Sequence, residues 1–452
     1  MISIMKTSRP LSYWVAQAMV VAVLILMSRA DWVLSSLYHD AQTPSGIGLA
    51  VIALFIVVLL VVVPLALLLP TKLSEPALRV LTVAVAIYIL APAIRALPLF
   101  PAELGPTHKI GLVLSTLLLT WLAVTKLSSA QWPRLQLALI VGGLLFVSTP
   151  MLAVKAIDPI HLRVPAGMSP QRATVVLLLD ELNAEAGEQI AAAITQAGGA
   201  PRTHRIKAVG TSTITVIPEM FGGPHVPQAR VCTTTAVCDP AGIFDFSRLH
   251  FDPADRFHIV GFHHPYCAAN GLASCVRLAS TSSPPVTSLL CSFMRLLPVR
   301  PATVCEWSVP DDWESFRNGV RAAALNSPFW NSGGTLYAHL PFPHPPGNQP
   351  GGDLLADYKD NLGLAGHIAA QVWRKGYERF GNDFRLIVIS DHPLRQALWC
   401  KHGKYRETGC NLTPTAFEGQ VPYIISGGDV TDDRVPADNA HLFNPTSSRG
   451  TP

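Results

Sequence analysis

The chain has 452 residues, of which 49% are hydrophobic and only 14% are charged, whereas soluble globular proteins carry about 25% charged residues. The shortage is concentrated in residues 1–155, which hold 14 of the 64 Asp, Glu, Lys and Arg side chains. This distribution excludes a wholly soluble, a disordered and a collagen-like protein. A formal net charge of +4 without a run of Lys or Arg also argues against nucleic-acid binding.

Residues 1–154 are predicted to form a transmembrane domain of five helices. Each apolar stretch approaches the ~20 residues needed to cross ~30 Å of hydrocarbon, and each must be helical because lipid cannot satisfy backbone amides. The stretches cover residues 11–37, 47–69, 78–97, 110–125 and 135–154.

Basic residues in alternate short loops set the predicted orientation. Lys6, Lys72 and Lys126 fall in loops on one side, which the positive-inside rule places in the cytoplasm. After five crossings, everything beyond residue 154 lies outside. In an alternative interpretation residues 1–30 are a cleaved signal peptide, which leaves four spans and the same external side. Either way the chain is predicted to be a multi-pass integral membrane protein.

All eight cysteines lie between Cys232 and Cys410, in the part predicted to be external. This placement indicates disulfides and an oxidising compartment. A zinc–cysteine site is the alternative, but no Cys-x-x-Cys occurs. Short loop lengths favour pairing between neighbours, although eight cysteines allow many connectivities. The predicted pairs are Cys232–Cys238, Cys267–Cys275, Cys291–Cys305 and Cys400–Cys410.

After a connector of residues 155–172, residues 173–428 are predicted to form an α/β domain. Apolar runs predict strands near 173–179, 256–262, 335–340, 384–390 and 421–426, and helices near 184–197, 311–325 and 354–380. This alternation indicates a mostly parallel sheet covered by helices. Residues 429–452 are polar and contain proline, and they are predicted to be a disordered tail.

Polar residues follow several of these strands, at the edge of the sheet where α/β proteins bind ligands. His339 ends one strand, and acidic residues end two others. His263 and His264 follow a fourth strand, where they either line the pocket or form a polar loop beside a disulfide. A mixture of carboxylates and imidazoles suits zinc or manganese. The candidate metal ligands are Asp180, Asp391, His392 and His402.

The segment 209–221 begins with a glycine followed by hydroxyl residues and then apolar positions, which is typical of a loop entering a helix. One interpretation is simple N-capping by Ser and Thr. The other is a hydroxyl nucleophile at the helix N-terminus, where the helix dipole and a bound metal favour the alkoxide.

This segment resembles the nucleophile segment of the membrane-bound phosphoethanolamine transferases, in the sulfatase-like branch of the alkaline phosphatase superfamily. The family pattern Gly-Thr-x-Thr, four residues, Pro-x-Met-Phe places the nucleophile at Thr213. The apolar strand with an acidic ligand matches 175–180, Ser-Asp-His matches 390–392, and His-Gly matches 402–403. Some superfamily members use two adjacent acids, so the resemblance also offers Glu181 as an alternative to Asp180. The order of the motifs and the five spans before an external domain also agree with the family.

A His-(four residues)-His segment, which the family links to substrate and second-metal contacts, matches His339 and His344. The chain departs from the family at Pro393, where a glycine is expected after Asp-His. The family's cysteine pair beside the nucleophile is also replaced, by Val209 and Glu219.

The resemblance implies a phosphotransferase that depends on Zn²⁺, with Mn²⁺ as an alternative. Thr213, itself also a metal ligand, attacks a membrane phospholipid and passes phosphoethanolamine to an envelope glycan or lipid. The implied location is the bacterial inner membrane, with the N-terminus cytoplasmic and the catalytic domain periplasmic. Two alternatives remain open: a membrane-tethered phosphodiesterase of the same superfamily, and a catalytically inactive scaffold.

Overall fold

The computed structural model describes most of the predicted external domain. The described residues are 38–39, 52, 56, 173–278, 313–347, 353–400, 405, 419–428, 435–440 and 442–443. The chain divides into two compact units, and the second comprises Ser35–Ala41, Ala156–Ser283 and Ala302–Pro452. The predicted spans and the connector lie outside the described residues, apart from Ile52 and Ile56. Within the described ranges, no helix combines the length and apolar character that crossing a bilayer requires.

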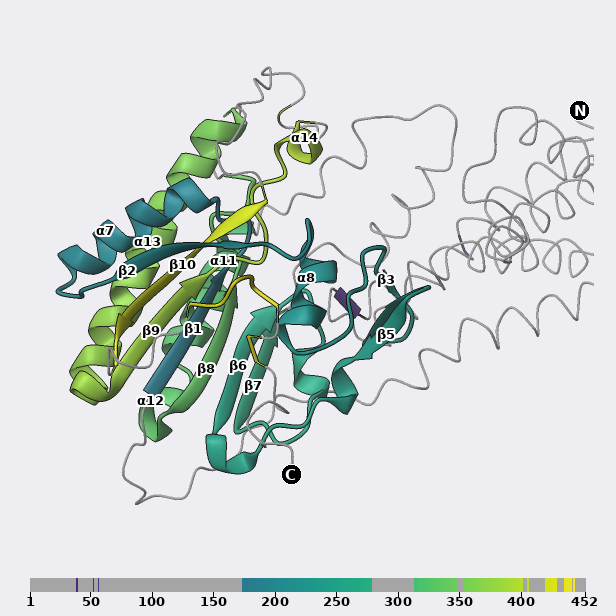
Figure 1. Cartoon of the computed structure of the whole chain (residues 1–452), viewed down its shortest axis with the longest axis horizontal. Coiled ribbons are helices and arrows are strands. Elements are labelled where there is room, and N and C mark those ends of the chain that lie inside the picture. Colours follow the sequence, from purple (N-terminus) through teal and green to yellow (C-terminus); the bar gives the residue numbers. More distant parts are fainter. Residues whose placement is uncertain are drawn as a thin grey trace, which may run out of the picture. The chain divides into compact units, whose positions relative to one another are not determined.

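A seven-stranded sheet forms the centre of the second unit, in the order β2-β10-β9-β1-β8-β6-β7 (Figure 1). Neighbouring strands from β9 to β7 are parallel, whereas β10 is antiparallel to both β9 and β2. The sheet is therefore mixed and mostly parallel. The strands are β1 (Ala173–Leu179), β2 (Arg202–Lys207), β6 (Phe257–Phe262), β7 (Ser274–Leu278), β8 (Gly334–Leu340), β9 (Phe384–Ile389) and β10 (Gln420–Gly427).

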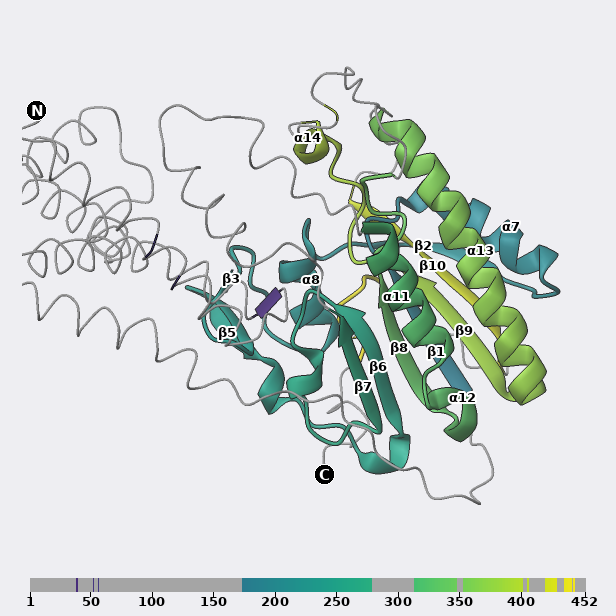
Figure 2. The same ribbon diagram turned by 180° about the vertical axis from the view of Figure 1, so that it is seen from behind.

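Both faces of the sheet are covered. Val175 and Leu177 of β1 belong to a core shared with four helices on one face, and Figure 2 shows three of them, α11, α12 and α13, in front of the sheet. Val176 and Leu178 belong to a second core on the other face, which α8 (Thr213–Met220) covers. The four helices of the first face are α7 (Gly187–Gln196), α11 (Trp313–Leu325), α12 (Phe329–Ser332) and α13 (Leu354–Phe380).

The predicted α/β architecture is confirmed for the described residues. The first strand and the longest helix have the predicted ends, 173–179 and 354–380. The remaining predicted strands differ from the observed ones by about one residue at either end. This accuracy has a physical cause: strands buried on both faces are continuous apolar runs, which a sequence reveals directly.

Two parts of the fold have no counterpart in the prediction. Strand β2 has the sequence Arg-Thr-His-Arg-Ile-Lys, in which only Ile206 is buried, so it lacks an apolar pattern and forms only through its pairing with β10. A separate three-stranded sheet comprises β3 (Arg230–Val231), β4 (Ala236–Asp239) and β5 (Gly242–Asp245). Its strands are too short for a hydrophobic period to be recognised.

Two of the predicted disulfides are present. Cys232–Cys238 cross-links the small sheet, and Cys267–Cys275 joins the loop after β6 to β7. Cys400 is also disulfide-bonded, to a partner outside the described residues. The fourth predicted pair, Cys291–Cys305, lies outside the described residues as well. Disulfides of this kind form in an oxidising compartment.

A few residues of the predicted tail, 429–452, are described, and they contact the domain. Lys207 pairs with Asp438 in an isolated β-bridge, and Asn439 is completely buried. Phe443 donates a backbone hydrogen bond to Met220 and stacks on Phe221 with the ring centroids 5.0 Å apart. These contacts join the described part of the segment to β2 and α8.

Candidate metal centre

The candidate site lies at the edge of the sheet where the parallel strands β1 and β9 end. Leu178 of β1 is in register with Ile389 of β9, so the residues that follow both strands leave the sheet at the same level. Asp180 directly follows β1, and Asp391 and His392 follow β9 after one intervening serine. Parallel pairing therefore brings together residues that are about two hundred positions apart in the chain.

Asp180, Asp391 and His392 form a compact cluster. One ligand atom from each lies within 4.8 Å of the others, which is the spacing of ligands around a single cation. Their exposed fractions are 3%, 0% and 0%, so water does not solvate the charges. A divalent cation would compensate the two buried carboxylates.

Unpartnered oxygens provide the test of whether a metal fits. Asp180 Oδ1 and Asp391 Oδ2 are buried and make no hydrogen bond with any described residue. Burial, reinforced by the negative charge of Asp391, raises the pKa of Asp180 well above its ordinary value. Burial also acts to raise the pKa of Asp391, but the adjacent His392 and His339 outweigh it, and the pKa is lowered. Two close carboxylates with free oxygens are a suitable donor set for a cation.

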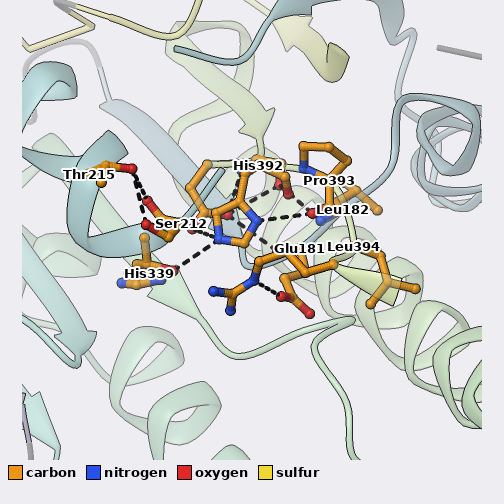
Figure 3. Close-up of polar contacts among 12 residues, drawn as sticks. Glu181, Leu182, Ser212, Thr215, His339, His392, Pro393 and Leu394 are labelled. Atoms are coloured by element: carbon orange, nitrogen blue, oxygen red, sulfur yellow. Dashed lines mark hydrogen bonds and ion pairs between the residues drawn. The ribbon is translucent and has the colours of Figure 1, made fainter. Parts of the chain in front are cut away.

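The ring of His392 is oriented for coordination. Its Nδ1 lies 3.0 Å from the carbonyl oxygen of Pro393, which accepts a hydrogen bond, so Nδ1 carries the proton. Nε2 then has a free lone pair, and it lies 3.3 Å from Asp391 Oδ2. A histidine whose second nitrogen donates to a carbonyl is the usual arrangement of a metal ligand. Figure 3 shows the ring between Ser212, Pro393 and Glu181.

Thr213 is the first residue of α8 and approaches the cluster from the other side. Its Oγ1 lies 3.3 Å from His392 Nε2, and the residue is 7% exposed. The neighbouring hydroxyl points elsewhere, because Ser212 Oγ lies 3.1 Å from Thr215 Oγ1. Ser212 occupies the N-cap position of α8, but its side chain accepts no hydrogen bond from a backbone amide of the helix, so the capping interpretation has no such bond to support it. The helix N-terminus directs positive potential toward the Thr213 oxygen.

Glu181 does not share the environment of Asp180. Its two oxygens accept hydrogen bonds from Arg395 Nε at 2.6 Å and from Trp399 Nε1 at 2.7 Å. Glu181 has a backbone φ of 63°, so its side chain does not continue the alternation of side chains along β1, and its carboxylate faces the loop after β9. Because both oxygens already have partners, the geometry favours Asp180 over Glu181 as a metal ligand.

The Glu181–Arg395 pair gives a stability prediction. Replacing Arg395 with Leu leaves the fully buried Glu181 carboxylate without its cation, which costs about 2–4 kcal/mol once the partial exposure of Arg395 is taken into account. Urea unfolding of the purified protein would measure the loss. Adding Glu181→Gln should restore part of the stability, and a double variant weaker than the single one would contradict this explanation.

The remaining predicted site residues differ in how the structure places them. His339, the sixth residue of β8, is fully buried; its Nδ1 lies 2.9 Å from Tyr266 Oη, and its Nε2 has no described partner. His344 packs edge-on against Trp399 with the ring centroids 4.9 Å apart. Burial lowers the pKa of both imidazoles, that of His339 to about 4. His402 lies outside the described residues.

Asn439 is a structural residue of the site that the sequence did not reveal. Its side-chain NH₂ donates to the carbonyls of Ser390 at 3.1 Å and Asp391 at 2.6 Å. Its Oδ1 accepts from the backbone N–H of Val209 at 2.9 Å. One side chain thus holds the ligand loop and the segment before Thr213 together. No local pattern marks such an asparagine, because its partners are 48 to 230 positions away.

Asn439→Ala is expected to remove all three hydrogen bonds and to cost about 2–4 kcal/mol, since each contributes roughly 1 kcal/mol and buried carbonyls are left without donors. The change should appear as a lower thermal unfolding temperature. Asn331→Ala is the matched control, because Asn331 is exposed and should change stability by less than about 0.5 kcal/mol. Equal effects of the two variants would disprove the role of Asn439.

The sequence matches no protein-family model and no curated protein. Among solved structures it is similar to an alkaline phosphatase superfamily protein from Vibrio parahaemolyticus, with 16% identity and a TM-score of 0.32 over 60% of this chain. The chain covers 64% of that protein, slightly less than two thirds of its length. It is also similar to the integral membrane lipooligosaccharide phosphoethanolamine transferase A from Neisseria meningitidis. That match has 15% identity and a TM-score of 0.30, over 90% of this chain and 88% of the other. Similarity this low carries no functional conclusion, so the site itself must supply one.

Proposed function

We propose that the protein is a metal-dependent phosphotransferase that forms a covalent phospho-Thr213 intermediate. The observation that carries the proposal is the pair of buried, unpartnered carboxylate oxygens of Asp180 and Asp391 next to His392 Nε2 and the Thr213 hydroxyl. Asp180, Asp391, His392 and Thr213 would hold the metal. Zinc suits this mixture of nitrogen and oxygen ligands, and manganese is the alternative.

When bound, the metal lowers the pKa of the Thr213 hydroxyl and stabilises negative charge on the phosphoryl oxygens. Thr213 Oγ1 forms a bond to phosphorus, while the bond from phosphorus to the diacylglycerol oxygen breaks. The threonine proton is released, and the departing oxygen takes up a proton. An acceptor hydroxyl or phosphate oxygen then attacks the same phosphorus and frees Thr213. His339 and His344, and also His402, are proposed to contact the substituted phosphoryl group or a second metal.

The proposed donor is a membrane phospholipid with an ethanolamine headgroup, and the proposed acceptor is an envelope glycan or lipid. A donor that stays in the bilayer agrees with the apolar first third of the sequence. The two disulfides agree with a catalytic domain in the periplasm of a bacterium whose inner membrane holds the chain.

The decisive experiment incubates the full-length, zinc-loaded protein in detergent with phosphatidylethanolamine labelled in its headgroup. We expect mass spectrometry to find phosphoethanolamine on the peptide that contains Thr213. Transfer of the label to an added glycolipid would establish a transferase, whereas release of free phosphoethanolamine would establish a phosphodiesterase. An unlabelled peptide together with no tightly held zinc or manganese would favour the inactive scaffold and overturn the proposal.

A further inference from the structure

The segment Ser35–Ala41 belongs to the same compact unit as the sheet, although the residues on either side of it belong to the other unit. Figure 1 shows its described part in purple beside α8 and the small sheet. Tyr38 is completely buried, and its ring lies 6.5 Å from that of Phe246 in an edge-on contact. The sequence predicts this segment at the end of the first span, so its place in the core of the domain is unexpected.

The segment contacts two consecutive histidines after β6. Tyr38 Oη lies 2.9 Å from His264 Nδ1, and His39 Nδ1 lies 3.0 Å from the carbonyl oxygen of His263. The rings of His39 and His263 are stacked with their centroids 3.9 Å apart. The carbonyl of Tyr38 also accepts a hydrogen bond from Arg277. These contacts fix the segment through several polar groups rather than through one apolar side chain.

His264 has an unused nitrogen in a fully buried position. Its exposed fraction is 0%, and its Nε2 makes no hydrogen bond with any residue that the structure describes. Burial is the main reason why its pKa is well below the ordinary value; His39 and His339 add to the lowering, whereas the nearby backbone of Thr213 acts against it. The ring lies close to the backbone of Thr213, the proposed nucleophile. A buried polar atom without a partner is rare in proteins and requires an explanation.

Counting hydrogens shows which form the His264 ring takes. Burial raises the pKa of Tyr38, so the phenol keeps its proton. If the phenol donates to His264 Nδ1, the histidine proton resides on Nε2, and that N–H is the single unsatisfied group. If Nδ1 donated instead, both the phenol proton and Nε2 would lack partners among the described residues. The first arrangement leaves fewer buried groups unsatisfied, and it makes Nε2 a hydrogen-bond donor.

A second pair of residues repeats this arrangement at the same edge of the sheet. Tyr266 Oη lies 2.9 Å from His339 Nδ1, and His339 Nε2 is likewise buried without a described partner. Strands β6 and β8, which lead to these two histidines, are parallel neighbours. Two buried imidazoles with unused Nε2 atoms therefore lie at this edge of the sheet. Buried N–H donors that are already desolvated are suited to an oxyanion.

We propose that Tyr38 is a positioning residue that orients His264, and that His264 Nε2–H donates a hydrogen bond to a non-bridging oxygen of the phosphoryl group at Thr213. The ligand class is thus a phosphate monoester or diester oxyanion. The proposal rests on the proposed function for the identity of that group. It also assigns a catalytic-domain role to a segment of the N-terminal region.

The test measures the affinity of the full-length, zinc-loaded protein for inorganic phosphate by isothermal titration calorimetry. His264→Phe keeps a ring of similar size but removes the donor, and it should weaken binding about 10- to 100-fold, the range for a hydrogen bond to a charged group. Tyr38→Phe removes only the hydroxyl that orients His264, and it should weaken binding roughly 3- to 10-fold. The double variant should match His264→Phe alone, because Tyr38 acts through His264.

His258→Phe is the matched control. His258 is also a buried histidine, but it lies near the start of β6, away from His264, and both of its nitrogens have partners, Ser274 Oγ at 2.7 Å and Ser332 Oγ at 3.0 Å. This variant should lower the thermal unfolding temperature and leave phosphate affinity unchanged. A similar loss of phosphate affinity in the control would show that the histidine variants act through general destabilisation, and it would overturn the proposal.

Three further outcomes would overturn the proposal: no phosphate binding by the unmodified protein, a double variant whose loss equals the product of the two single losses, or a loss of bound zinc in His264→Phe with unchanged phosphate affinity. The last would make His264 a metal ligand. Failure of the proposed function is distinguishable, because it would appear as an unlabelled Thr213 peptide while the phosphate titrations kept their expected order.

Discussion

Thr213→Ala is expected to lower turnover of phosphatidylethanolamine by roughly 10⁴-fold or more and to abolish covalent labelling, because the oxygen that forms the bond to phosphorus is removed. The variant should fold normally, since only a hydroxyl beside His392 is lost from a residue that starts a helix. It should also retain most of the zinc, because Asp180, Asp391 and His392 remain. Turnover by chromatography and zinc content by atomic absorption measure both effects.

Ser212→Ala is the matched control, because Ser212 precedes Thr213 and carries a hydroxyl that is directed to Thr215 instead of the cluster. We expect this variant to change turnover by less than about tenfold. If Thr213→Ala remained fully active, the nucleophile would be Thr211 or Ser212, and labelling of the peptide would distinguish the two.

Asp180→Asn is expected to have opposite effects on the metal-loaded and the metal-free protein. It removes one metal ligand, which should lower zinc affinity on the order of 100- to 1,000-fold. This loss is a fraction of the ~10–16 kcal/mol of binding free energy that all the ligands of a structural zinc site provide together. Turnover at limiting zinc should fall accordingly. In the metal-free protein the same change removes a buried carboxylate whose pKa is raised by burial and by Asp391. The metal-free variant should therefore be more stable than the metal-free parent, by about 1–3 kcal/mol.

The dependence of this gain on pH distinguishes it from a general effect on packing. A carboxyl group whose pKa is raised on folding binds more protons in the native state, so the stability of the metal-free parent falls as pH rises above the unfolded value of about 4. The advantage of Asp180→Asn should therefore be absent below about pH 4 and grow above it. Denaturant unfolding in the presence of a chelator measures it. A gain that is independent of pH would contradict the assignment of the unpartnered carboxylate.

Glu181→Gln is the control for Asp180→Asn, since the two residues are adjacent and each carries a buried carboxyl group. Glu181 has both oxygens bound to Arg395 and Trp399, so its replacement should reduce stability with and without zinc. Zinc affinity should change less than tenfold. The reverse result, with zinc lost from Glu181→Gln and retained by Asp180→Asn, would exchange the roles of the two acids.

Much of the α/β domain could be predicted because its elements are marked locally. The apolar run of β1 and the long amphipathic α13 have the predicted ends, and the motif spacing placed Asp180 and Asp391 beyond strands that prove to be adjacent. Strand β2 escaped prediction, because Ile206 is its only buried residue and its conformation depends on pairing with β10. Local sequence predicts an element when burial of that element alone determines its pattern.

The functional importance of other residues could not be predicted for the same reason. Asn439 lies in a polar stretch with the composition of a disordered tail, and only the loops that it contacts make it a buried residue. Tyr38 follows an apolar run with the composition of a membrane span, yet it contacts His264, 226 positions away. Neither residue carries a neighbouring pattern from which its partner could be inferred.

By itself, the sequence determined which residue types are available for chemistry, where the apolar strands begin and end, and which edge of the sheet receives the acidic residues, because all of these depend on neighbours in the chain. Only the tertiary structure decided that the Asp180 carboxylate lies beside Asp391 and His392, while that of Glu181 faces Arg395. It also decided that Tyr38 completes the surroundings of His264. Those outcomes depend on the direction of individual side chains and on which distant segment is packed against them, and the physical chemistry of neighbouring residues specifies neither.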